Sequence, residues 1–356
     1  MAGRGALTGA EAGLAAMLAA CTPASQPMGP ATVAPTLTET ALIATDGYRL
    51  PVRVTVPDAR AVDEHAPVET VETAETPADV PARGEPAAVI LALHGFDDYS
   101  ASFEDAAAAW AEAGIVTVAM DQRGFGETEN IGIWAGTDTY VADAVTAVEA
   151  VARTYPGRPL VLLGESMGSA VALLALARRP DLPVDALILV APAVWDWEAM
   201  PFWEELPFEA AVALFPGMIV SGEGLDLEPT DNALVQREMA YDPLVLKENR
   251  LDTVAGLLDL MAAALPAAAT LDRPTLIQLG ENESIVPEAH VRALFDGLAT
   301  APHPPVIAVY PDGYHMLLRD LAADEPIGDI PAFITDPDAP LPSGADRIPL
   351  PWAAGG

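Results

Sequence analysis

The sequence of 356 residues predicts an α/β fold, in which helices cover both faces of a mostly parallel sheet. From residue 87 onward, short apolar segments alternate with helical ones, an order that implies right-handed crossovers between parallel strands. The apolar segments are nearly continuous, as expected for strands buried on both faces, and only Thr117 and Gln278 are polar within them. The alternation breaks once, over residues 194–272, where we expect a helical insertion.

Residues 1–21 have the order of a secretory signal, with a basic start at Arg4, a small-residue apolar stretch and a small-residue cleavage site. The end of this stretch, Leu-Ala-Ala-Cys21, resembles the lipobox of bacterial lipoproteins, which implies a lipid on Cys21. We therefore expect an exported, membrane-anchored protein, periplasmic or at the cell surface, with peripheral membrane contact through that lipid. Glu11 lies inside the apolar stretch and opposes insertion, so a cytoplasmic protein with an Ala-rich tail stays the alternative.

The composition excludes several classes of protein. With 52 Asp and Glu against 17 Lys and Arg, the net charge is −35 and Lys247 is the only lysine, so nucleic acid is not an expected partner. The acidity favours a solvated, self-repelling surface, and adaptation to salt stays open. No uninterrupted apolar run approaches the roughly 20 residues of a membrane-spanning helix, which excludes a polytopic membrane protein. The single cysteine excludes an intramolecular disulfide and a thiolate metal cluster.

Two segments before the alternating region are expected to be loosely held. Residues 22–38 are rich in Pro, Thr and Ala without a period, which favours a tether. Residues 58–86 carry eight acidic residues and four prolines, and we expect a disordered insertion there. Between them, apolar runs at 40–44 and 48–56 flank Asp46-Gly47, a pair that is typical of a β-hairpin.

The core is expected in two parts, residues 39–193 and 273–336, with a lid at 194–272 between them and a Pro-rich tail at 337–356. The lid has an aromatic-rich start and a Leu- and Met-rich helix at 253–265, and this span is too long for a connecting loop. A helical subdomain without a role in substrate binding is the alternative. The expected strands are 88–93, 115–120, 160–163, 186–190, 275–279 and 306–309, and the expected helices are 102–113, 140–153, 167–178 and 288–298.

Residues 164–168, Gly-Glu-Ser-Met-Gly, directly follow an apolar strand and precede an Ala- and Leu-rich helix. This order of strand, Gly-x-Ser-x-Gly and helix is the context of a nucleophile elbow, in which Ser166 sits on a strained turn with its hydroxyl exposed. A side chain at Gly164 or Gly168 would collide with the neighbouring strand or helix. Ser166 is therefore the expected nucleophile.

A serine hydroxyl needs a base to take its proton, and the chain has five histidines. His315 follows the last expected strand, and a loop at the carboxyl end of a strand lies at the same sheet edge as Ser166. We therefore expect His315 to be the base and His94 to support its own loop. The remaining histidines lie in the acidic insertion (His65), in an expected helix (His290) and in a proline-rich loop (His303).

The carboxylate that orients the imidazole is expected between the serine and the histidine in chain order. Glu281 and Glu283 follow the strand at 275–279, and Asp196 and Glu198 follow the preceding strand. Glu283 is preferred because it lies beyond the end of the strand and before the helix that starts near Pro287. Glu281, on the same loop, stays open.

A tetrahedral oxyanion needs two preorganised N–H donors. One is expected from the backbone of Met167, at the start of the elbow helix. The other is expected from the backbone of Phe96, in a loop where Gly95 allows a tight turn.

Five motifs in this order resemble the α/β-hydrolase superfamily: residues 94–96, 121–126, 164–168, 280–287 and 310–315. The resemblance is greatest to the monoacylglycerol lipase and lysophospholipase group, which includes the serine aminopeptidases, and it covers about residues 40–335. It implies an eight-stranded sheet, a lid after the sixth strand, no cofactor and a Ser-acid-His triad. Ser166 and His315 match that triad, whereas the family usually has Asp where this chain has Glu283. Arg123 is expected to pair with a buried carboxylate.

The sequence thus predicts a serine hydrolase that cleaves carboxylic esters of acyl lipids, such as monoacylglycerols or lysophospholipids. An aromatic lid favours an acyl chain, and a lipid anchor brings the enzyme to such substrates at a membrane. An aminopeptidase or amidase of the same fold is one alternative, with Glu165 or lid carboxylates as the acidic pocket that it needs. A catalytically silent lipoprotein that binds acyl ligands is the other. No pattern indicates the oligomeric state.

Overall fold

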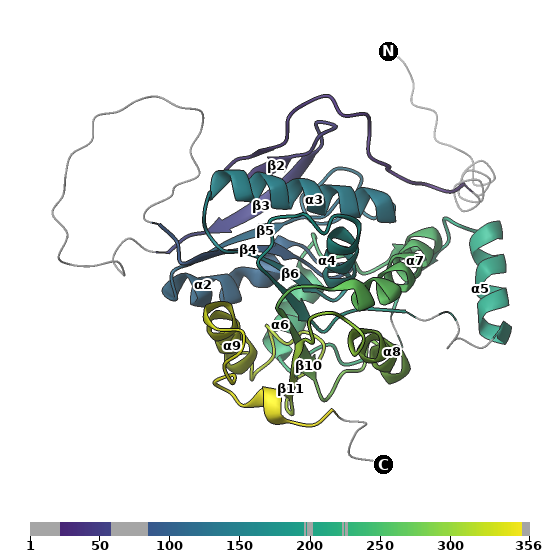
Figure 1. Cartoon of the computed structure of the whole chain (residues 1–356). Coiled ribbons are helices and arrows are strands. Elements are labelled where there is room, and N and C mark those ends of the chain that lie inside the picture. Colours follow the sequence, from purple (N-terminus) through teal and green to yellow (C-terminus); the bar gives the residue numbers. More distant parts are fainter. Residues whose placement is uncertain are drawn as a thin grey trace.

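The computed structural model describes residues 22–57, 85–195, 197, 202–222, 224 and 227–350 (Figure 1). Of the predictions above, those for residues 1–21 with Cys21, for residues 58–84 with His65, and for Asp196 and Glu198 lie outside these ranges. The strands are β1 (Thr36–Leu37), β2 (Ala41–Ile43), β3 (Arg49–Thr55), β4 (Ala88–Leu93), β5 (Ile115–Met120), β6 (Leu160–Glu165), β7 (Ala186–Val190), β8 (Ile219–Val220), β9 (Asn249–Arg250), β10 (Thr275–Gly280) and β11 (Val306–Tyr310). The α-helices are α2 (Glu104–Glu112), α3 (Thr137–Thr154), α4 (Met167–Arg178), α5 (Phe202–Leu214), α6 (Ala233–Tyr241), α7 (Leu251–Ala267), α8 (Glu288–Leu298) and α9 (Asp324–Thr335).

Within the described residues, the main sheet holds nine strands in the order β1-β2-β3-β5-β4-β6-β7-β10-β11. From β5 to β11 the neighbouring strands are parallel, while β1, β2 and β3 pair antiparallel, with β3 on β5. The predicted α/β class is confirmed, and the six predicted apolar strands agree with the structure within two residues at each end. The implied count of eight strands is wrong, because β1 forms within the segment predicted to be a tether.

Two apolar cores lie on the two faces of this sheet, because alternate residues of a strand point to opposite faces. On β4, Val89 and Leu91 belong to the larger core, which also contains residues of α3, α4, α7 and α8. Ile90 belongs to the smaller core, with residues of α2 and α9. Figure 1 shows α3 above β5 and β4, and α2 and α9 below them. The sheet is therefore covered on both faces, as predicted.

Both ends of the described chain are bound to the domain, unlike the predicted tether and tail. The backbone N–H of Met28 donates to Thr139 Oγ1 at 3.0 Å. At the other end, the Ser343 hydroxyl donates to Asp329 Oδ2 at 2.5 Å. These contacts join backbone and small polar groups to partners on the folded surface. They leave no periodic pattern in the sequence, so the composition of the two segments does not predict them.

The insertion predicted to be a lid divides into two parts. Residues 202–250, which we call the cap, contain α5, β8, α6 and β9, and Figure 1 shows α5 at the outer edge of the molecule. The following helix, α7, packs against α4, with Leu260, Met261 and Ala264 buried in the larger core. Among the described residues, Leu251–Thr270 is the one helical stretch long and apolar enough to cross a membrane. Its packing against the core accounts for that composition.

Arg123 joins two segments, and its predicted pairing with a buried carboxylate is confirmed. Its Nε and Nη2 atoms donate to Asp143 on α3, at 2.6 and 3.0 Å. Its Nη1 and Nη2 atoms donate to Asp46 in the turn between β2 and β3, at 2.9 Å each. We call Asp46, Arg123 and Asp143 the Arg123 cluster.

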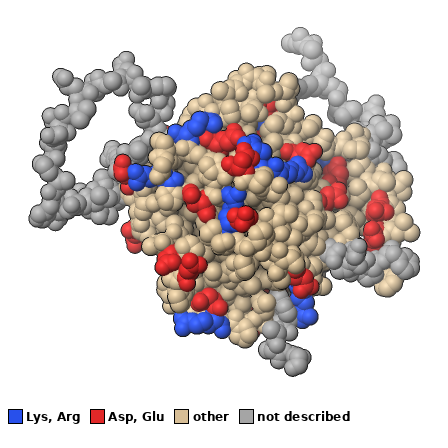
Figure 2. Space-filling model, in the orientation of Figure 1, with Lys and Arg blue, Asp and Glu red and all other residues tan. Residues whose placement is uncertain are grey.

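Charged side chains are spread over the face of the molecule in Figure 2. Basic groups lie singly or in small groups beside acidic ones, with uncharged surface between them. On this face, the described residues form no continuous basic surface of the kind that binds nucleic acid.

Candidate active site

Ser166 lies on a sharp turn between β6 and α4, as the Gly-x-Ser-x-Gly motif predicts. Its φ of 52° lies in the left-handed region, which residues other than glycine rarely adopt, so the turn is strained. A Cβ on Gly164 would overlap the backbone of Gly168, and a Cβ on Gly168 would overlap the carbonyl of Leu93. The two glycines therefore permit the close approach of β6, α4 and β4 that this turn requires.

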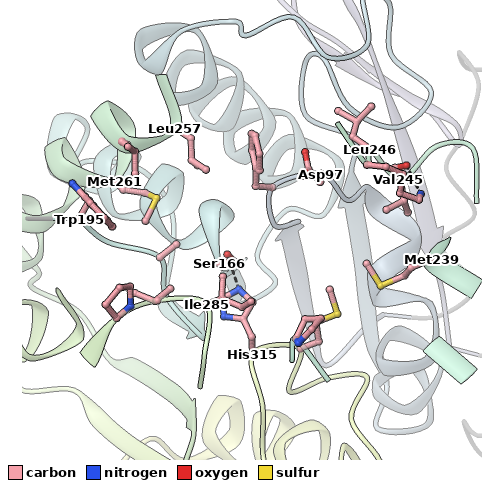
Figure 3. Close-up of a pocket in the computed structure, with 18 residues that line it drawn as sticks. Asp97, Ser166, Trp195, Met239, Val245, Leu246, Leu257, Met261, Ile285 and His315 are labelled. Atoms are coloured by element: carbon pink, nitrogen blue, oxygen red, sulfur yellow. Dashed lines mark hydrogen bonds between the residues drawn. The ribbon is translucent and has the colours of Figure 1, made fainter. Parts of the chain in front are cut away.

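Three side chains from separate loops meet at this turn. Ser166 Oγ lies 2.9 Å from His315 Nε2 (Figure 3). His315 Nδ1 lies 2.6 Å from Glu283 Oε2. His315 follows β11 and Glu283 follows β10, so all three residues come from the carboxyl ends of parallel strands. The geometry is that of a nucleophile, a base and an orienting acid.

Glu283 is held in place by its own loop. Its Oε1 accepts hydrogen bonds from the backbone N–H groups of Ile285 (2.6 Å) and Val286 (3.0 Å). Burial by itself would raise the pKa of this carboxyl, but the charge of His315 and these hydrogen bonds hold the pKa below its usual range. Burial would likewise lower the pKa of His315, and the Glu283 carboxylate raises that pKa above its ordinary value. Glu281 is exposed to solvent.

The other described histidines have different surroundings. His94 is buried, and its Nε2 accepts a hydrogen bond from the backbone N–H of Gln122 at 2.9 Å, so its proton lies on Nδ1, 2.7 Å from the Gly95 carbonyl. Burial lowers the pKa of His94, which keeps the ring neutral in the loop that it supports. His290 stacks on Trp195 at 4.1 Å, and His303 is exposed.

The backbone N–H groups of Phe96 and Met167 are the expected oxyanion donors. Met167 is the first residue of α4, where an N–H has no acceptor within the helix. Within the described residues, no hydrogen bond from either N–H is found. A Cβ added to Gly95 would lie 3.2 Å from Ser166 Cβ, so the Phe96 loop runs beside the nucleophile. Both N–H groups are thus available to a group bound at Ser166.

A cavity of about 450 Å³ opens onto Ser166 and His315. In Figure 3, side chains of α7 and Trp195 line one side of it, and Met239, Val245 and Leu246 of the cap line the other. Its wall is mostly apolar, which suits an acyl chain. Among the described residues, no group of three or more His, Cys, Asp or Glu side chains is arranged to hold a metal ion.

Three residues near the triad were not found from the sequence. Asp97 lines the cavity. The side chain of Asn249, in the cap, donates hydrogen bonds to the Asp97 carboxylate. Arg319, four residues after His315, is half-buried, and its Nη2 lies 4.0 Å from Glu165 Oε2. Glu165 is itself buried and does not line the cavity, so it does not supply the acidic pocket considered above. Of these residues, the motifs contain only Glu165, and a motif does not tell whether its variable residue is buried.

Residues 84–322 match the hydrolase family described as serine aminopeptidase S33. The chain belongs to this family. The match spans both parts of the α/β core and the insertion between them, including Ser166, Glu283 and His315. The prediction of a hydrolase with the α/β-hydrolase fold is confirmed by this membership.

Two curated relatives are lipases. The chain is 27% identical over 258 residues to the monoacylglycerol lipase of Mycolicibacterium smegmatis, covering 70% of this chain and 89% of that lipase. It is 26% identical over 248 residues to the monoglyceride lipase of Homo sapiens, covering 67% and 78%. Among solved structures, a soluble variant of monoglyceride lipase from Saccharomyces cerevisiae is similar with a TM-score of 0.65 at 16% identity, covering 87% of this chain and 98% of that one. This last likeness supports the fold.

Proposed function

We propose that this protein hydrolyses the ester bond of acyl lipids, with monoacylglycerols as its substrate class, through Ser166, His315 and Glu283. The observation that carries the proposal is the hydrogen-bonded series from Ser166 Oγ through His315 to Glu283, beside an apolar cavity. The two lipase relatives support an acyl ester as the bond that is cleaved.

In the first half of the reaction, Ser166 Oγ attacks the acyl carbonyl carbon and its proton passes to His315 Nε2. The Glu283 carboxylate keeps the other ring proton on Nδ1 and stabilises the imidazolium that forms. The N–H groups of Phe96 and Met167 stabilise the oxyanion. When the bond to the alcohol breaks, His315 returns the proton to the leaving oxygen, and the acyl group stays on Ser166.

In the second half, a water molecule attacks the carbonyl of the acyl-enzyme and gives a proton to His315. The bond to Ser166 Oγ then breaks, Oγ regains the proton from His315, and the fatty acid leaves. His315 must be neutral to begin each half.

The charges around the cavity favour a neutral head group over a phosphate. Apart from the triad, Asp97 and Lys247 are the charged residues that line the cavity. Lys247, the only lysine, donates to the carbonyls of Asp242 and Val245, at 2.9 and 2.5 Å, so two of its three N–H donors are already used. A net charge of −35 also repels an anionic lipid. We therefore expect faster turnover of a monoacylglycerol than of a lysophospholipid with the same acyl chain.

The test begins with a fluorophosphonate probe, which labels an activated serine covalently. The native protein should be labelled and Ser166→Ala should not, and a native protein that stays unlabelled would leave the silent acyl-binding lipoprotein as the better hypothesis. A panel of monoacylglycerols, lysophospholipids and aminoacyl amides then identifies the substrate class. Faster turnover of the amides would favour the aminopeptidase alternative.

Membrane anchoring is a separate proposal that rests on the sequence of residues 1–21. We propose that Cys21 is lipid-modified after export and brings the enzyme to its substrates at a membrane surface. In a bacterial host, the native protein should partition into the detergent phase of a cell extract, and Cys21→Ser should stay in the aqueous phase. Equal partitioning of the two would support the cytoplasmic alternative.

A further inference from the structure

The loop that carries Phe96 is bound to the cap next to the nucleophile. The backbone N–H of Leu246 donates to the Asp97 carbonyl at 2.9 Å. The Asn249 side chain donates to both carboxylate oxygens of Asp97, at 2.9 Å each. Asp97 thus receives hydrogen bonds from the cap on its main chain and on its side chain, although 152 residues separate it from Asn249.

The backbone of Asp97 is strained at this point. Its φ is 67°, in the left-handed region that favours glycine, and it directly follows Phe96. A non-glycine residue keeps such a conformation only where its surroundings hold it there. The hydrogen bonds from Leu246 and Asn249 supply that restraint, so the backbone conformation directly after Phe96 depends on the cap.

In the described residues, Asn249 makes its side-chain hydrogen bonds to Asp97. Its side chain is buried, with 7% of the residue exposed, and its Oδ1 has no hydrogen-bond partner there. Leaving a buried amide oxygen unpaired is unfavourable, because the group loses its hydration without a replacement. The amide is therefore oriented by its bonds to Asp97, and the internal structure of the cap does not use its oxygen.

From this geometry we infer that Asp97 and Asn249 are positioning residues. Through their contact, the cap holds the Phe96 loop so that the Phe96 N–H can donate to the oxyanion. The inference rests on the proposed function, since it assigns the oxyanion to Phe96 and Met167. A consequence is that binding of an acyl chain under the cap affects the rate of ester cleavage through the buried contact between Asn249 and Asp97.

Two variants break this contact in different ways. Asn249→Leu removes the donor at nearly the same size, and Asp97→Gly removes the acceptor while glycine adopts the left-handed conformation without strain. A small displacement of an oxyanion donor slows the reaction. We therefore expect kcat for a monoacylglycerol to fall by about 10- to 100-fold in each variant, with KM within about threefold of the native value. Asp97→Gly keeps the test valid if Asn249→Leu fails to fold.

Asp97→Asn is the conservative rescue. Asparagine tolerates the left-handed region and keeps one of the two oxygens that accept from Asn249 Nδ2. Its kcat should stay within about threefold of native, because the contact survives. Gln236→Leu is the matched control, since it removes an amide of the same cap, whose Nε2 donates to the Thr230 carbonyl at 2.5 Å, away from the Phe96 loop. It should leave kcat unchanged.

A readout specific to the oxyanion separates positioning from general loosening of the cap. Each variant is assayed on an aryl ester and on the matching thiono ester, whose sulfur accepts hydrogen bonds from N–H groups poorly. If the Phe96 N–H is displaced, the rate on the ester divided by the rate on the thiono ester should fall by about 10-fold in Asn249→Leu and Asp97→Gly. In Gln236→Leu this ratio should equal that of the native protein.

Three results would overturn the inference: native kcat in Asp97→Gly, an unchanged ester to thiono ester ratio, or equal losses in Asn249→Leu and Gln236→Leu. Labelling of the native protein by the fluorophosphonate probe is measured first. Failure of that labelling counts against the proposed function, whereas normal labelling with native-like variants counts against the positioning role alone.

Discussion

The protein contains two groups of buried charge that differ in how completely their hydrogen bonds are made. In the Arg123 cluster, four hydrogen bonds join one guanidinium to the carboxylates of Asp46 and Asp143. Beside the triad, Glu165 is equally buried, yet neither of its carboxylate oxygens has a hydrogen-bond partner in the described residues. Arg319 lies 4.0 Å from Glu165 but gives its hydrogen bond to Asp98.

The pKa shifts follow from this difference. Burial would raise the pKa of Asp46, but Arg123 and two backbone N–H groups lower it to about 2. Asp143 is more deeply buried, and its pKa rises to about 6 although Arg123 offsets part of the effect. Burial raises the pKa of Glu165, and the charge of Arg319 opposes that rise.

Buried charge thus has two uses in this fold. In the Arg123 cluster, four of the five guanidinium N–H groups are paired with carboxylates, and these bonds tie the β2–β3 turn to α3. A buried carboxylate without hydrogen bonds, such as Glu165, is unfavourable for stability. Its negative charge nevertheless acts on the triad, because Glu165 is one of the residues that raise the pKa of His315. Substitutions in the two places should therefore change different quantities.

The largest effect is expected at the triad. Glu283→Gln should lower kcat by about 10³- to 10⁴-fold, because a neutral amide neither stabilises the imidazolium nor holds the correct ring tautomer. Steady-state kinetics on a monoacylglycerol measure this, and unfolding in denaturant checks that the fold is retained. Glu281→Gln, two residues away and exposed, is the matched control and should have native kcat. The reverse result would assign the acid to Glu281.

A smaller effect, on stability rather than rate, is expected at the Arg123 cluster. Arg123→Met leaves two buried carboxylates without their cation and should lower the free energy of unfolding by about 3–5 kcal/mol. The kcat of the folded fraction should stay native, as the cluster makes no contact with the triad. Arg178→Met, which removes an exposed ion pair with Asp138, is the control and should change stability little. A large loss of kcat in Arg123→Met would contradict the division between the two clusters.

The smallest effect is expected from Glu165→Gln, and it concerns pH. Cleavage needs neutral His315, so kcat/KM of the native enzyme should fall as the pH drops through the raised pKa of that residue, above 6.5. Removing the Glu165 charge lowers the pKa of His315, and the acid limb of the profile should move to lower pH. Burial raises the pKa of Glu165, which limits the size of this shift. A profile identical to that of the exposed control Glu112→Gln would show that Glu165 does not act on His315.

Much of the fold and of the candidate site is predictable because its signals are local. The apolar strands β4, β5 and β7 begin and end at the predicted residues, since an uninterrupted apolar run marks a strand buried on both faces. Gly164 and Gly168 mark the elbow because no other side chain fits there. His315 and Glu283 follow from the rule that carboxyl ends of parallel strands share one edge.

The predictions that failed depend on distant partners. The segment before residue 39 has no apolar pattern, yet it contributes β1, and the backbone N–H of Met28 binds it to the Thr139 side chain of α3. The insertion reads as one lid, but α7 packs in the core because α4 offers it an apolar face. Neither outcome can be inferred from the segment alone.

By itself, the sequence determined the alternation of strands and helices, the strained serine turn and the order of the catalytic groups, because spacing and side-chain size act between near neighbours. Only the tertiary structure decided which charges are paired. Asp46 meets Arg123 across 77 residues and Asp97 meets Asn249 across 152, whereas the Glu165 carboxylate has no hydrogen-bond partner among the described residues. Charge is visible in a sequence, but its partner and its burial are properties of the packed chain.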